Sequence, residues 1–110
     1  MVNATLCSTN GVEPWAANVN FEANGSMWVT GINTKYAHYK NITENDHVVV
    51  VYKTPDFEII AKGIASLSEP DTNQIASATV NFSWLRLVEN QNVTDYTDSE
   101  EIGRVVSTHI

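Results

Sequence analysis

Apolar and polar residues alternate along most of this chain, and a period of two is typical of a β-strand with one buried face. The clearest case begins at Pro14, after which Trp15, Ala17, Val19 and Phe21 fall on one face of the predicted strand. An Asn-Gly pair, which favours a tight hairpin turn, lies on each side of this strand. The start of the chain is therefore predicted to form an antiparallel meander.

Six strands are predicted in all. They cover residues 2–8, 14–21, 27–30, 48–52, 58–67 and 79–87. The fourth is apolar throughout, which is typical of a strand covered on both faces. In the fifth, Gly63 would permit the bend or bulge of a closing barrel. In the sixth, alternation places Val80, Phe82 and Trp84 on one side.

Hairpin connections between these strands predict a small Greek-key or meander β-barrel, because a sheet of this size must cover its apolar face and its edges. Closure or dimerisation would do both. One short helix is expected between the third and fourth strands. Residues 1–98 are assigned to the barrel domain, and residues 99–110 to a C-terminal tail that is a short helix or disordered, with Ser99 a weak candidate cap.

The segment that leads into the expected helix concentrates positive charge. The net charge of the chain is −7, yet two of its six basic residues, Lys35 and Lys40, flank His38 here. Asn33 or Thr34 is the expected N-cap, so that Lys35 and His38 would occupy the first helical turn. Because positive charge is unfavourable at that end of a helix, the arrangement predicts a negatively charged partner.

Phosphate is the natural candidate for this partner, because the start of a helix offers several N–H donors. Hydroxyls and charged side chains of the same segment would add hydrogen bonds to it. The residues concerned are Thr30, Thr34, Lys35, His38 and Lys40. A plainer interpretation stays open, since lysines on a short surface helix are commonly only solvated.

Length, charge and cysteine content narrow the function classes. A chain of 110 residues has room for one domain. Its acidic charge argues against nucleic acid and anionic lipid as partners, because both require a broad basic face. The single cysteine, Cys7, excludes an internal disulfide and fits a reduced cytoplasmic setting, and the three histidines lack metal-ligand spacing. Without a long apolar run or a signal peptide, the chain is expected to be soluble and unexported, with no membrane partner.

Several short motifs, taken in order, carry a resemblance to a known family. They are Pro14-Trp15, Asn24-Gly25, Trp28-Val-Thr30, Thr34-Lys35 and His38-Tyr-Lys-Asn41-Ile42 before the apolar run at Val48. Together they resemble the pyridoxamine 5′-phosphate oxidase-like, FMN-binding split-barrel family over residues 3 to 98. The chain is most similar to members with a histidine three residues before an Asn-Ile pair. It is much shorter than true pyridoxamine-phosphate oxidases and lacks their basic C-terminal segment, so their activity is not predicted.

The resemblance implies a mostly β, six-stranded antiparallel split β-barrel with one short helix, assembled as a homodimer that holds two FMN molecules in clefts between the subunits. The phosphate would be held by Thr30, Thr34, Lys35 and His38, with Lys40 as a helper. The ring system would lie along the third strand, near the backbone of Trp28 and Val29. Weaker candidates on the neighbouring strand are Trp15, Ala16 and Asn18.

The function expected from this resemblance is that of an FMN-binding protein, a flavin-dependent oxidoreductase of unknown substrate. Bound flavin itself accepts the hydride or electrons, so the lack of a recognisable catalytic dyad does not count against it. Two alternatives stay open. One is a non-catalytic binder of flavin, haem or another planar anion, and the other is a cofactor-free dimeric interaction module.

Overall fold

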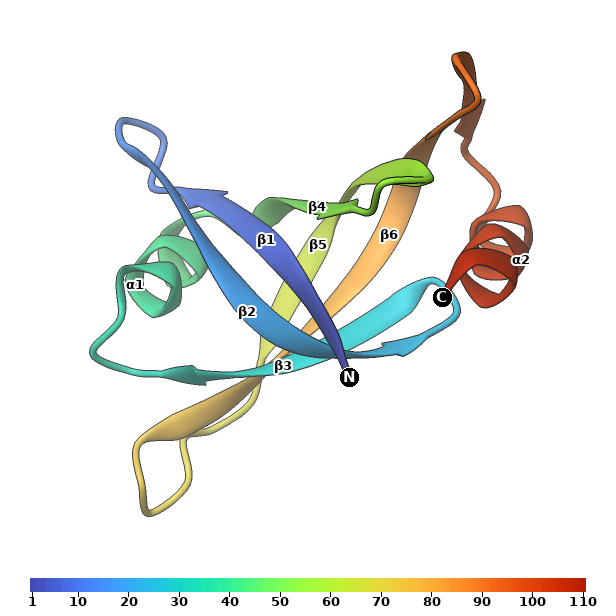
Figure 1. Cartoon of the computed structure of the whole chain (residues 1–110). Coiled ribbons are helices and arrows are strands. Elements are labelled where there is room, and N and C mark those ends of the chain that lie inside the picture. The colour runs from blue at the N-terminus through green and yellow to red at the C-terminus, as the bar shows by residue number, and fades with distance from the viewer.

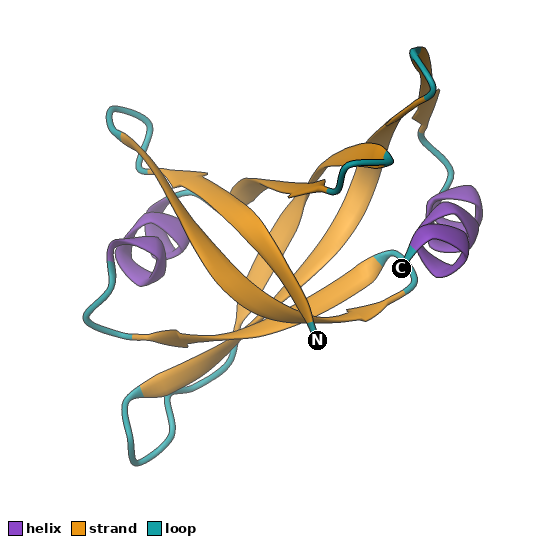
Figure 2. Cartoon of the chain, viewed as in Figure 1, coloured by secondary structure: helices purple, strands orange, loops and turns teal.

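The computed structural model describes all residues from Met1 to Ile110, as seven strands and two helices (Figures 1 and 2). In chain order they are β1 (Val2–Thr9), β2 (Pro14–Asn24), β3 (Met27–Asn33), α1 (Ala37–Glu44), β4 (His47–Lys53), β5 (Phe57–Leu67), β6 (Ile75–Glu89), β7 (Asn92–Tyr96) and α2 (Ser99–His109). All six predicted strands are present. Neither helix is long and apolar enough to cross a lipid bilayer.

Six of the strands close into an antiparallel barrel. The order around the wall is β3-β2-β1-β4-β5-β6, and β3 pairs back onto β6 to complete the ring. The prediction of a mostly β, six-stranded antiparallel barrel is therefore confirmed. β7 pairs only with β6 and extends that strand's end as a hairpin beyond the wall (Figure 1).

The C-terminal segment, expected to be a short helix or disordered, is the helix α2. The structure therefore has two helices and not the single one that the resemblance implied. The Asp98 carboxylate caps this helix by accepting hydrogen bonds from the backbone N–H groups of Glu100 and Glu101, so the cap is Asp98 and not Ser99. The apolar side of α2 is buried against the barrel. Its buried residues are Ile102, Val105 and Val106. Figure 2 shows the two helices on opposite sides of the barrel.

Aromatic rings fill the middle of the barrel. Trp28 is 1% exposed, and its ring centroid lies 5.6 Å from that of Phe21 and 5.3 Å from that of Phe82. Its indole N–H donates to the carbonyl oxygen of Gly25 at 3.2 Å, so the one polar atom of this side chain is satisfied. Trp28 is thus a core residue that joins three strands of the wall.

The barrel is open between β2 and β3. These strands pair only from Glu22–Asn24 to Met27–Val29, after which they separate. The other edge of β3 remains paired with β6 as far as Asn33. The chain then turns into α1, which packs against β1, β5 and β3 (Figure 1). One edge of β3, from Thr30 onward, therefore has no strand partner.

A bulge interrupts the pairing of β5 and β6. Their register shifts between Lys62 and Gly63, as the glycine predicted. The shift gives β6 one extra residue, so that Ser83 and Trp84 both face outward while Phe82 and Leu85 on either side of them are buried. The prediction that Trp84 shares a face with Phe82 is therefore wrong, because strict alternation fails at a bulge.

The predicted cap of α1 is also wrong. The residue at the N-cap is Tyr36, which makes no capping hydrogen bond through its side chain. The Asn33 side chain instead accepts a hydrogen bond from the backbone N–H of Lys35 at 2.9 Å, which forms a local turn before the helix. Lys35 consequently lies ahead of α1 and not in its first turn.

Candidate functional site

The start of α1 is the candidate site, and its electrostatics are unusual. No side chain caps this end, and no acidic residue lies in the first turn. Such a helix end carries free backbone N–H groups and a partial positive charge. The Lys35 and Lys40 side chains beside it are exposed, and neither forms an ion pair. The structure thus places Lys35 directly before a helix end that has no anion of its own, with Lys40 one turn into the helix.

Thr34 also lies at this end. It is half-buried, and its hydroxyl is 3.5 Å from the side-chain oxygen of Gln74, at the outer limit of a hydrogen bond. The hydroxyl therefore has no strong internal partner. Of the predicted phosphate ligands, Thr34, Lys35 and Lys40 have polar groups open to the surface.

Thr30 and His38 are placed differently, because both are buried. The Thr30 hydroxyl donates to the carbonyl oxygen of Asn20 at 2.7 Å, across the point where β2 and β3 separate. The side chain of Thr30 therefore supports the edge of the opening. It does not project from the surface.

His38 belongs to a buried polar cluster that the sequence did not predict. Its Nδ1 lies 2.6 Å from the Ser8 hydroxyl, which also accepts a hydrogen bond from the Asn41 side-chain amide at 3.2 Å. All three residues are less than 10% exposed. The cluster ties α1 to the end of β1. The sequence of β1 contained one sign of this cluster. Ser8 is polar, yet it follows Val2, Ala4 and Leu6 on the face that alternation predicts to be buried.

The imidazole of His38 has one nitrogen with no partner. Its Nε2 atom is buried and makes no hydrogen bond. Burial lowers the pKa of His38, because the charged imidazolium would be poorly solvated there and its neighbours Ser8 and Asn41 carry no charge. Burial therefore favours the neutral form of this side chain.

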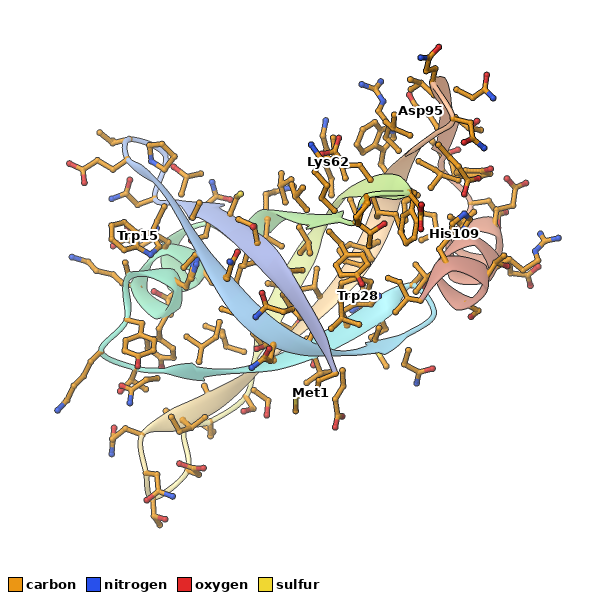
Figure 3. The ribbon with its side chains drawn as sticks, viewed as in Figure 1. Met1, Trp15, Trp28, Lys62, Asp95 and His109 are labelled. Carbon is orange, nitrogen blue, oxygen red and sulfur yellow. The ribbon has the colours of Figure 1, made fainter.

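The backbone near the predicted ring position is partly occupied. Trp28 and Val29 are paired with β2 on one side and with β6 on the other, so their peptide groups lie inside the sheet. Free peptide groups begin one residue later, on the unpartnered edge of β3. Of the weaker candidates, Trp15 is 52% exposed near the start of β2 (Figure 3), and Ala16 and Asn18 are exposed on the same strand.

No protein-family model matches this sequence, and no curated protein matches it either. Solved structures do match. The heme-binding protein of Mycobacterium smegmatis has a TM-score of 0.78 and 15% identity, over 94% of this chain and 55% of that one. General stress protein 26 of Bacillus anthracis has a TM-score of 0.72 and 14% identity, over 86% and 89%. The pyridoxamine 5′-phosphate oxidase-related, FMN-binding protein of Nostoc punctiforme has a TM-score of 0.71 and 8% identity, over 87% and 86%.

The chain has the split-barrel fold of the pyridoxamine 5′-phosphate oxidase-like proteins. The match extends over most of the chain, as the resemblance in the motifs predicted. The split of this barrel is the opening between β2 and β3. Because these identities are low, the likeness establishes the architecture, and the ligand has to be argued from the residues at the split and at the start of α1.

Proposed function

We propose that this split barrel binds FMN, with the phosphate at the start of α1. The observation that carries the proposal is the uncapped, acid-free helix end beside Lys35 in a chain of net charge −7. A phosphate would accept hydrogen bonds from the free N–H groups and offset the positive charge of both the helix end and the lysine. The donor set present at this site therefore fits the group.

Each exposed residue of the site has a distinct role in this proposal. Lys35 and the backbone N–H groups of Ala37 and His38 hold the phosphate, and the Thr34 hydroxyl adds a further donor. Lys40 lies one turn into α1, three residues after Ala37, and so belongs to the same side of the helix. Thr30 and the His38 imidazole would not contact the phosphate, because their polar atoms are bonded or buried in the protein interior. They support the backbone on which the site is built.

The flavin ring would lie along the unpartnered edge of β3, next to Val29, where free peptide groups can bond its polar edge. Bound FMN supplies hydride or electron transfer, and the chain's own residues bind it, orient it and exclude water. On this basis we propose that the protein is a flavin-dependent oxidoreductase of unknown substrate.

A homodimer would complete the cleft. The outer face formed by β3, β6 and the second half of β5 carries uncharged residues at adjoining positions. They are Met27, Val29, Gly31, Ser77, Thr79, Asn81, Ile64 and Ser66. Two of them, Met27 and Ile64, are large apolar residues that are 38% and 37% exposed. A charge-depleted face with exposed apolar side chains is the kind of surface that protein interfaces use.

The proposal is tested by titrating FMN into the protein and following the quenching of flavin fluorescence. Lys35→Gln should weaken binding about tenfold, because one charge-assisted hydrogen bond contributes about 1.5 kcal/mol. The matched control is Arg104→Gln, which removes an equal charge from the exposed side of α2, across the barrel. Binding that is absent in the wild type, or equal in both variants, would refute the proposal.

A further inference from the structure

A second hollow lies on the outer wall of the barrel, where β1, β4, β5 and β6 run side by side. Its volume is about 460 Å³, within the range of about 300–1,000 Å³ usual for small-molecule sites. Cross-strand register places four of its lining residues in one row across the strands, in the order Cys7, Val49, Lys62 and Trp84. Neither Lys35 nor Lys40 lines it. Ser8, whose hydroxyl bonds His38, lies at one end of the hollow, so the hollow adjoins the start of α1 but shares neither of its lysines.

The bulge between β5 and β6 gives this hollow its shape. Because the register shifts at Gly63, the neighbouring residues Ser83 and Trp84 both turn outward and stand at one side of the hollow. Gly63 forms part of the floor, and any side chain there would collide with the carbonyl oxygen of Asn81. Position 63 thus has to remain a glycine for β5 and β6 to approach this closely, and the Trp84 indole lies at the side of the hollow. Bulges that re-aim a side chain in this way are frequent next to binding sites.

The lining is largely apolar, with one cation available at its rim. The ammonium of Lys62 lies 4.6 Å from the centroid of the Trp84 ring and forms no ion pair. Asp95, the acidic group that faces this region from β7, is already engaged by Arg86, with nitrogen to oxygen distances of 2.8 and 3.0 Å. The guanidinium of Arg86 also lies over the Trp84 ring, 5.2 Å from its centroid. Lys62 is thus a cation with no ion-pair partner beside an aromatic wall, and Asp95, whose pKa its charge helps to lower, is bonded to Arg86.

We propose that this hollow binds a small aromatic carboxylate. The planar body would lie against Trp84 and Val49, where apolar contact and ring stacking stabilise it. The carboxylate would reach the Lys62 ammonium and accept a charge-assisted hydrogen bond from it. A neutral aromatic molecule would make only the first set of contacts, and an aliphatic anion only the second. The site therefore selects for both properties together.

The test compares 2-naphthoate with its neutral analogue 2-naphthamide, using amide chemical-shift changes of the full chain in NMR titrations. Naphthoate should bind saturably, with the largest shifts at residues 62–64 and 83–84. Lys62→Gln should weaken naphthoate binding about fivefold, as expected for a partly exposed ion pair of about 1 kcal/mol, and should leave naphthamide binding unchanged. The control Lys53→Gln, which alters an exposed lysine outside the hollow, should change neither.

Three outcomes would overturn the inference. They are an absence of saturable shifts with naphthoate at millimolar concentration, equal naphthoate affinity in the wild type and Lys62→Gln, and equal affinity of naphthoate and naphthamide for the wild type. The first of these, combined with a loss of dimer on Trp84→Ala in analytical ultracentrifugation, would identify a second copy of the chain as the occupant. Lys35→Gln separates the two proposals, because it should weaken FMN binding and leave naphthoate binding intact.

Discussion

The buried cluster of Ser8, His38 and Asn41 makes a sharp prediction about stability. In Ser8→Ala one oxygen atom is lost, and two buried groups lose their hydrogen-bond partner, namely Nδ1 of His38 and the side-chain amide of Asn41. Each unsatisfied buried group costs about 1–3 kcal/mol, so the loss of two partners should lower the free energy of unfolding by about 2–6 kcal/mol. That is a large part of the about 5–15 kcal/mol typical of a domain.

Urea unfolding followed by tryptophan fluorescence measures this change. The matched control is Ser107→Ala, which removes the same atom from the exposed side of α2 and should stay within about 0.5 kcal/mol of the wild type. A double-mutant cycle with Asn41→Ala should return a coupling energy of about 1 kcal/mol, because both changes break the same hydrogen bond. If Ser8→Ala proved as mild as the control, the cluster would not tie α1 to β1 as argued.

Other predictions follow from the same structure. Gly63→Ala should lower the free energy of unfolding by more than about 2 kcal/mol, because the new methyl group meets the Asn81 carbonyl; a thermal midpoint equal to that of the wild type would refute this. Asp98→Ala should lower it by about 1 kcal/mol through loss of the α2 cap, measured by urea unfolding, and an unchanged midpoint would rule out that role. Stability should also fall as the pH drops below about 6.5, the ordinary pKa of histidine. Burial lowers the pKa of His38 in the folded state, so the unfolded chain binds a proton at a higher pH than the folded chain does. The free energy of unfolding therefore decreases as the pH falls from the unfolded pKa to the folded pKa. His38→Gln should flatten that part of the pH profile in urea titrations, and an unaltered slope would contradict the assignment.

The barrel was predictable because apolar and polar residues alternate along most of its strands. Each predicted strand is present, and Gly63 marked the bulge correctly because the close approach of β6 leaves no space for a side chain. The outward turn of Trp84 was not predictable from β6 alone. It depends on the register with β5, which is a property of the pair of strands.

Sequence analysis missed β7 and misplaced the start of α1, and in both cases the structure depends on polar contacts that alternation does not reveal. β7 is mostly exposed and has no apolar face, and it forms because it pairs with β6, aided by the Arg86–Asp95 ion pair. The start of α1 was misplaced because the Asn33 side chain bonds the Lys35 N–H and makes a turn there in place of a cap.

Of the candidate site, the sequence predicted the cluster of basic residues but not which of its side chains are buried. The excess of positive charge near Lys35 could be recognised in the sequence, and the structure places it just before an uncapped helix end. Alternation and helical spacing do not say whether a threonine or histidine near such a charge faces outward. Thr30 and His38 face inward because the carbonyl of Asn20 and the hydroxyl of Ser8 provide their hydrogen-bond partners.

The central claim is that a phosphate group binds at the start of α1, and NMR of the backbone amides tests it most directly. On addition of FMN, the N–H signals of Ala37 and His38 should shift and saturate together, and inorganic phosphate should shift the same two signals in the same direction with weaker affinity. If FMN left both signals in place while shifting others, or shifted none, the phosphate would not bind at the start of α1 and the proposed function would be wrong.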